Sequence, residues 1–469
     1  MSAFLDKAIA TGLVVVAIFS ALAFGSREPW SVGLVELMIT VLILLWAIKF
    51  AVDKRVRLSV PTIALPLAGL IALGLVQSVA TTGSDGRTHS LSMDVESTRG
   101  AVAVLVFLLA SFIIAVNFFV TRERLSALAN VLVIFGLSMS VFALIQHFTW
   151  DGHIYWIRPT PYSAFGPFVN RNHYAGYMEM LTPVPLALVL ARGVHKESWV
   201  FYGFASAVMG LTIVVSLSRG GIVSLIAGIA FVFIMSARHE RSHRRETGDG
   251  LTGEASLVSR RPSPTLKRGG VVALVAAVII LGVIWIGAEG IIERAAQSVD
   301  QMKGGDSQAE LFSRTEVWKD SWKMIRDNPI TGVGLGAYET AFPIYGRQNG
   351  TLVVNYAHND YIQALTDGGI VGGLLALAFI VLILRAMFRA MKSEDSLLAG
   401  LAIGFGAGVC SLLVHSLFDF NLQVPSNALL FLFLSAVISN IATTVTERGP
   451  EGALNCAAGV NVGGYATGV

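Results

Sequence analysis

The feature that most constrains this chain is the recurrence of long apolar segments along its length. A helix needs roughly 20 apolar residues to cross the hydrocarbon core of a bilayer, and about twelve segments approach that length. They lie near residues 8–24, 32–50, 60–80, 100–120, 125–146, 173–191, 199–217, 221–237, 271–288, 369–388, 397–416 and 427–445. Only 14% of the residues are charged, against about a quarter in soluble domains. The sequence therefore predicts an all-α polytopic membrane protein.

The basic residues set the predicted orientation of these segments. Alternate loops hold Lys54, Arg55, Arg57, Arg122, Arg124, Arg192, Lys196, Arg385, Arg389 and Lys392, with the densest basic run in 238–268. The positive-inside rule places these loops and both termini in the cytoplasm. The loops on the opposite side carry fewer basic residues for their length and span 25–31, 81–99, 147–172, 218–220, 289–368 and 415–426.

The same pattern divides the chain into four parts. Residues 1–288 hold the first nine predicted helices and include a basic linker, 238–270, whose Ser, Gly and Pro content predicts disorder near lipid head groups. Residues 289–368 form a large helical loop outside the cytoplasm, residues 369–446 hold the last three helices, and residues 447–469 form a disordered cytoplasmic tail. The linker lacks the interleaved aromatic residues of a nucleic-acid site. Positive-inside bias is therefore the preferred explanation of its charge, and no nucleic-acid partner is predicted.

The large loop contains one clear helix signal. Ser313 and Glu316 form a capping-box pattern, and an Asn-Pro pair ends the run that follows. Trp318, Trp322 and Ile325 fall on one face of this helix, which either lies at the membrane interface or packs on the helix bundle. The glycine-rich stretch "TGVGLGAY" comes next. It lacks the Gly-Lys-Ser/Thr of a phosphate loop, so nucleotide binding is disfavoured.

Unusual polar clusters gather on the side opposite the basic loops. They are "GPFVNRNHYAGYMEM" at 166–180, "SLSRGG" at 216–221, Arg314, "HND" at 358–360 and "HSLFDFNLQVPSN" at 415–427. Glu179 is the main charge inside a predicted span, where charge is costly. Taken singly, Arg219 could simply end a span, and His358 and His415 could be structural. Their shared side favours one site outside the cytoplasm, lined by arginines, histidines and amides.

The chemistry of these residue types suits a phosphorylated substrate. Arginine binds phosphate or diphosphate through a two-pronged fork and keeps its charge. A histidine near neutral pKa can take a proton from a sugar hydroxyl. No metal-ligand spacing and no hydrolase motif is present, so the sequence predicts neither a metal nor a cofactor.

One stretch, "HNDYIQALTDGGIVGG", resembles a known family motif. In that motif a histidine is followed by Asn, Ser or Gln, nine further residues, a glycine, two residues and then Gly, Thr or Tyr; here His358, Asn359, Gly369 and Gly372 fill these positions. "SLSRGG", "SRTEVWKDSWKMIRDNPITGVGLGAY", "FVNRNHYAGYMEM" and "HSLFDFNLQVPSNALLF" resemble further stretches of the same family. Over roughly residues 160–440 the chain is similar to the O-antigen ligase and O-antigen polymerase superfamily.

The resemblance implies a GT-C-like, inverting, metal-independent glycosyltransferase of the bacterial inner membrane. Its donor would be a glycan on undecaprenyl diphosphate, presented at the periplasmic face. His358 matches the essential histidine, which would deprotonate or orient the acceptor hydroxyl, while Arg219 and Arg314 match arginines that would hold the diphosphate. Further substrate-binding residues expected to line the site are Asn170, Arg171, Asn172, His173, Asn359, His415 and Asp419.

Several acceptors stay open at this point. The "FVNRNH" stretch resembles polymerases of a surface or exopolysaccharide, which favours that activity. The alternatives are a ligase acting on lipid A-core and a protein O-oligosaccharyltransferase. A transporter or flippase of lipid-linked glycans is disfavoured, because transporters place ionisable groups near the midplane and this chain has almost none there.

Overall fold

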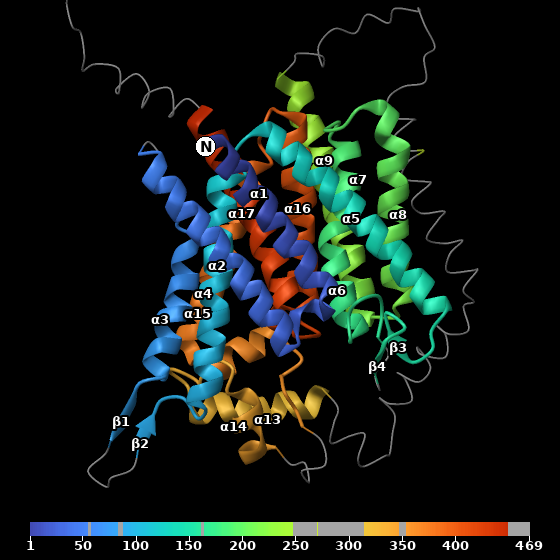
Figure 1. The fold of residues 1–469 in the computed structure, drawn as a ribbon. Coiled ribbons are helices and arrows are strands. Elements are labelled where there is room, and N and C mark those ends of the chain that lie inside the picture. Colours follow the sequence, from blue (N-terminus) through green and yellow to red (C-terminus); the bar gives the residue numbers. More distant parts are fainter. Residues whose placement is uncertain are drawn as a thin grey trace, which may run out of the picture.

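A computed structural model describes residues 1–54, 58–82, 88–160, 164–246, 270, 314–346 and 353–448 of the chain. These residues form a bundle of helices with two short two-stranded sheets (Figure 1). Most of the basic linker, the predicted span 271–288, the start of the large loop and nearly all of the C-terminal tail lie outside the described residues.

Nine helices in this part of the chain are long and apolar enough to cross a membrane. They are α1 Ser2–Leu22, α2 Pro29–Val52, α4 Val95–Phe118, α5 Arg122–Phe148, α8 Trp199–Val215 with the preceding turn η2 Lys196–Ser198, α9 Arg219–Glu246, α15 Asp360–Ala390, α16 Ser396–His415 and α17 Pro425–Arg448. Each coincides with a segment predicted from its apolar length. The prediction of an all-α polytopic membrane protein is confirmed.

Two further predicted spans form shorter helices. The segment at 60–80 forms α3 Ala64–Gln77, and the segment at 173–191 forms two helices, α6 Arg171–Leu181 and α7 Pro183–Leu190. Pro183 and Pro185 lack the backbone N–H that a continuous helix would need there. The prolines therefore divide this span in two.

Among the nine long helices of the described residues, α16 is the most buried, and it owes its central position to small residues. A stripe of glycines runs along it at Gly400, Gly404 and Gly408. A Cβ added at Gly404 would lie 2.9 Å from the Cα of Val184 in α7, and one at Gly408 would lie 2.4 Å from the carbonyl oxygen of Met180 in α6. Helices in a bilayer approach this closely where small residues face one another. The stripe fixes α6 and α7 against α16.

The large loop contributes two helices, α13 Arg314–Asp327 and α14 Tyr338–Tyr345, which lie across one end of the bundle (Figure 1). A small core joins them and includes Val317, Met324 and Phe342. The tryptophan face predicted for α13 stays outside this core, and Trp322 is 52% exposed. The helix therefore packs on its neighbours through the adjacent face.

The glycine-rich stretch 332–336 packs against a kink in α15. The kink is at Gly369, whose φ of 59° is left-handed. A Cβ there would lie 2.4 Å from the carbonyl carbon of Ile330, and one at Gly332 would lie 2.5 Å from that of Asp367. Only glycine permits such close contact between two backbones. The motif glycine at 369 thus shapes the short first part of α15.

The remaining short elements cap the same end of the bundle. They are the turn η1 Phe24–Ser26 between α1 and α2, the strands β1 Ala80–Thr82 and β2 Thr88–Ser90, the strands β3 His153–Ile154 and β4 Arg158–Pro159, and the turn η3 Asn421–Gln423 before α17. Both strand pairs are antiparallel, with Thr81 opposite His89 and His153 opposite Pro159. The N-terminus lies at the other end (Figure 1). The described loops that carry fewer basic residues for their length therefore lie together.

Candidate functional site

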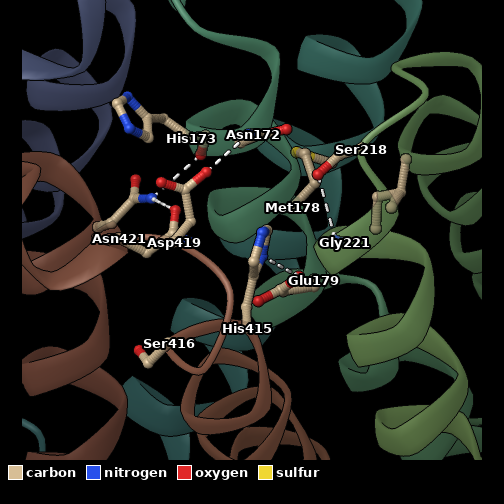
Figure 2. A network of polar contacts seen from close by, with 12 residues as sticks. Asn172, His173, Met178, Glu179, Ser218, Gly221, His415, Ser416, Asp419 and Asn421 are labelled. Carbon is tan, nitrogen blue, oxygen red and sulfur yellow. Dashed lines mark hydrogen bonds and ion pairs between the residues drawn. The ribbon is translucent and has the colours of Figure 1, made fainter. Parts of the chain in front are cut away.

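The site is centred on one buried carboxylate, Asp419, in the turn that follows α16. Its side chain is only 1% exposed. One carboxylate oxygen lies 3.2 Å from His358 Nδ1. The other accepts a 2.6 Å hydrogen bond from Asn172 Nδ2 (Figure 2) and lies 3.6 Å from Arg314 Nη2. Three residues predicted from separate segments thus meet at Asp419.

His358 is held in place by the residues around it. Its backbone φ of 52° is a left-handed value that residues other than glycine rarely adopt. Trp318 of α13 donates its indole N–H to the carbonyl oxygen of Ala357, at 2.8 Å. Asn359 caps α15 by accepting from the backbone N–H groups two and three residues later, each at 3.0 Å, and donates to the carbonyl oxygen of Leu417. As the N-cap of α15, Asn359 therefore helps to fix the position of His358, the residue before it.

Asp360 fastens the start of α15 to the turn after α16. Its Oδ2 accepts hydrogen bonds from the hydroxyl of Ser416 at 2.8 Å and from the backbone N–H of Leu422 at 3.1 Å. Its own backbone N–H donates to the carbonyl oxygen of Ser416. Because Asp419 lies between these two partners in the chain, the contacts set the position of the carboxylate relative to His358.

The start of α6 brings the third segment to the site. Asn170 caps the helix by accepting from the backbone N–H of Asn172, at 2.8 Å. Arg171 is the first residue of α6 and is partly buried. The ring of His173 is 2% exposed and meets Phe420 edge to face, with centroids 4.9 Å apart. Among these residues, Asn172 is the one that touches Asp419 directly.

A second buried pair lies deeper, between Glu179 and His415. Glu179 Oε2 is 2.9 Å from His415 Nδ1, and both side chains are at most 1% exposed (Figure 2). A Cβ added at Gly220 would lie 2.6 Å from His415 Nε2, so the first turn of α9 packs directly on this ring. Arg219 precedes that glycine and is exposed. Arg219 is therefore next in the chain to a residue that packs on His415, and it is not among the residues that contact Asp419 in the described part of the structure.

The environment of Asp419 keeps it charged. Burial alone would raise its pKa, but the hydrogen bond with His358 and the nearby positive charges, Arg314 among them, hold the pKa well below the usual range of a carboxyl group. His358 and Arg314 are 37% and 44% exposed, whereas Asp419 is enclosed. The carboxylate can orient both side chains without itself facing a substrate.

Among the described residues no group of three His, Cys, Asp or Glu side chains could hold a metal ion.

Several residues of the site were not predicted as members. Phe420 stacks on Tyr356, with centroids 4.4 Å apart, and Arg27 lies over both rings. Glu179 stood out in the sequence as a charge within a span, but its partner could not be read from the pattern. The aromatic rings carried no such signal, because large apolar residues are common throughout this chain.

Comparison with known protein families gives a match over the middle of the chain. The family model described as O-antigen ligase matches residues 204–377. No curated protein matches the chain. The matched range contains Arg219, Arg314 and His358, and it ends before Asp419 and the final helix. The match confirms the predicted resemblance: residues 204–377 of this chain are similar to the O-antigen ligase family and so to the O-antigen ligase and polymerase superfamily.

Proposed function

We propose that this protein is a glycosyltransferase that moves a glycan from undecaprenyl diphosphate to an acceptor hydroxyl at the periplasmic face of the bacterial inner membrane. The family match supports glycosyltransferase-type activity in general. Within that family we favour a polymerase, in which the acceptor is the next lipid-linked repeat unit of a surface or exopolysaccharide.

One observation carries the proposal: a single buried carboxylate contacts both the motif histidine and a motif arginine. His358 and Arg314 come from different segments of the chain, and they lie 3.2 Å and 3.6 Å from opposite oxygens of Asp419. A purely structural histidine needs no such arrangement. In an enzyme, however, the shared carboxylate keeps the proton acceptor, His358, and a residue that binds the diphosphate, Arg314, at a fixed separation.

His358 acts as the base in this mechanism. Because Asp419 stays ionised, it favours the tautomer in which His358 Nδ1 carries the proton and donates it toward the carboxylate. Nε2 then keeps its lone pair and can accept the proton of the acceptor hydroxyl. As that oxygen forms a bond to the anomeric carbon, the bond from this carbon to the diphosphate oxygen breaks. One such displacement inverts the configuration at the sugar.

The arginines serve the leaving group. Negative charge grows on the diphosphate as the bond breaks, and guanidinium groups placed there in advance stabilise it. Arg314 and Arg219 are both exposed enough to reach a ligand. Arg→Lys at either position should impair turnover, because a point charge replaces a fork. Full activity in both lysine variants would exclude the two guanidinium groups as ligands of the diphosphate.

Reconstitution of the purified full chain in liposomes tests the function. The liposomes contain a lipid-linked repeat unit and either include or lack lipid A-core, and products are separated by chain length. Growth of the glycan without lipid A-core supports the polymerase. Transfer in one step to lipid A-core would replace it with a ligase, and movement between leaflets without transfer would overturn the enzymatic proposal.

A further inference from the structure

Arg27, from the turn that follows α1, packs on the same aromatic ring as His358. Its guanidinium carbon is 5.4 Å from the centre of the Tyr356 ring and 5.5 Å from that of Phe420. Tyr356 is two residues before His358, and Phe420 directly follows Asp419. The ring of His358 also meets Phe420, with centroids 4.8 Å apart. Arg27 therefore belongs to the same cluster of side chains as the proposed base.

The backbone that leads to Arg27 has an unfavourable conformation. Phe24, Gly25 and Ser26 have φ values of 57°, 70° and 55°, all in the left-handed region. A Cβ at Gly25 would lie 2.8 Å from the ring of Phe168. Ser26 is fully buried, and its hydroxyl donates to the carbonyl oxygen of Ser20 at 3.1 Å. Such a turn persists only where its surroundings hold it, and it is typical of functional positions.

The β3–β4 hairpin supplies those surroundings. Arg158 pairs with Glu28 at 2.6 Å, and its guanidinium lies 4.7 Å from the centre of the Phe24 ring. The hydroxyl of Tyr155 donates to the carbonyl oxygen of Leu22 at 2.6 Å. The hairpin thus fixes the residues on both sides of Arg27. The carboxylate of Glu28, the next residue after Arg27, is paired with Arg158.

The charges around the cluster favour an anionic ligand. Asp419 is its central carboxylate and is already shared by His358 and Arg314. An arginine that lies over aromatic faces keeps its edge N–H groups available for an oxyanion, whereas the face is desolvated. The ring of His173, which also packs on Phe420, has a buried Nε2 with no hydrogen-bond partner among the described residues. Both features are consistent with a polar group entering beside Phe420.

We infer that Arg27 is a further substrate-binding residue, which holds a phosphate oxyanion of the lipid-linked diphosphate beside His358. This inference rests on the proposed function, because it assumes that the substrate carries a diphosphate. It adds to Arg219 and Arg314 a cation from the turn that follows α1. The first turn of the bundle would then be part of the donor site.

Binding of undecaprenyl diphosphate to the purified full chain in detergent tests the inference without requiring turnover. The variants are Arg27→Gln and Arg27→Lys, with Arg122→Gln as the matched control, since Arg122 is an exposed arginine paired with Asp395 at the other end of the bundle. We expect Arg27→Gln to weaken binding about tenfold or more, the usual range for a lost hydrogen bond to a charged group. Arg27→Lys should weaken binding by a smaller factor, and the control should match the wild type.

The lysine variant separates ligand binding from packing. It keeps a cation over the rings but loses the fork, so a packing role alone predicts normal affinity in Arg27→Lys. If Arg27→Gln fails to fold, this variant carries the test. Equal affinity of wild type and both Arg27 variants would overturn the inference but leave the proposed function intact. Failure of the wild type to bind the lipid would overturn both.

The same titration with phosphatidylglycerol distinguishes a donor site from a site for bulk lipid head groups. A loss in Arg27→Gln confined to undecaprenyl diphosphate supports the inference. An equal loss for both lipids would assign Arg27 to the membrane surface and overturn it.

Discussion

The two ends of the helix bundle both pair arginine with carboxylate, but they do so in opposite environments. At the end that holds the N-terminus, Arg122 lies 2.8 Å from Asp395, and the two side chains are 60% and 25% exposed. At the other end, Arg314 lies 3.6 Å from an Asp419 that is 1% exposed. The shorter distance therefore belongs to the exposed pair.

The comparison shows that distance alone does not indicate importance. An exposed pair gains little, about 0–1 kcal/mol, because water and salt screen it. A buried carboxylate needs its partners, since removing one leaves a charge without compensation and costs about 3–5 kcal/mol. We expect substitutions at the Asp419 end to affect chemistry and folding, and equivalent substitutions at the N-terminal end to affect neither strongly.

The largest effect should follow His358→Ala. Loss of a general base typically reduces the rate by about 10²–10⁴-fold, so transfer in the reconstituted assay should fall to near background. His153→Ala is the matched control, because His153 lies at the same end of the bundle and is exposed beside Asp151. Near-normal product in His358→Ala, with normal protein level, would exclude the histidine as base.

Asp419→Asn should come next. The amide cannot hold the His358 Nδ1 proton as a carboxylate does, and we expect a rate loss of about 10²-fold or more. Asp395→Asn, at the exposed end, should leave the rate unchanged. Equal transfer rates in Asp419→Asn and Asp395→Asn would contradict the expected difference in function between the two ends of the bundle.

The same aspartate predicts a pH dependence of stability. Its pKa is lowered in the folded state, so the ionised carboxylate stabilises the fold above the pKa of the unfolded chain, about 3.9 for aspartate. That contribution is lost as the pH falls from this value through the lower folded pKa. The unfolding temperature of the wild type should therefore drop more steeply in acid than that of Asp419→Asn. Parallel curves would show that Asp419 is not held by its cationic neighbours.

Glu179→Ala should mainly affect folding. It leaves His415 buried without its partner, and we expect a loss of about 3–5 kcal/mol in the free energy of unfolding. Glu240→Ala provides the comparison, since Glu240 is 3.5 Å from Arg192 and both are partly exposed. Thermal unfolding in detergent measures both variants, and equal shifts would mean that burial does not distinguish these pairs.

Much of this architecture could be predicted because its signals are local. Apolar length predicted the described spans, and the "HND" stretch indicated His358 as a candidate base, a role that stays a prediction, without any knowledge of its neighbours. Pro183 and Pro185 could have predicted the division of the sixth span, and Asn359 is a typical helix cap.

What the sequence could not predict is which distant side chains meet. Arg27 is one arginine in a short loop, and only the left-handed turn before it directs it toward Tyr356 and Phe420. The buried face of α13 was likewise decided by tertiary packing, since the glycines of 332–336 bring the loop close to α15. Arg27 and Tyr356 are hundreds of residues apart in the chain, and the contact of Gly332 with Asp367 also joins separate segments, so no local pattern records either contact.

The smallest effect should be the coupling between Arg122 and Asp395, measured by a double-mutant cycle. Asp395 also caps α16 by accepting from the backbone N–H groups of Leu397 and Leu398, so Asp395→Asn removes the charge but keeps a good capping residue. With Arg122→Gln as the second change, we expect a coupling of about 0–1 kcal/mol that decreases as salt is added. A coupling as large as the loss in Glu179→Ala would contradict the comparison. The charges at the N-terminal end would then contribute strongly to the stability of the fold.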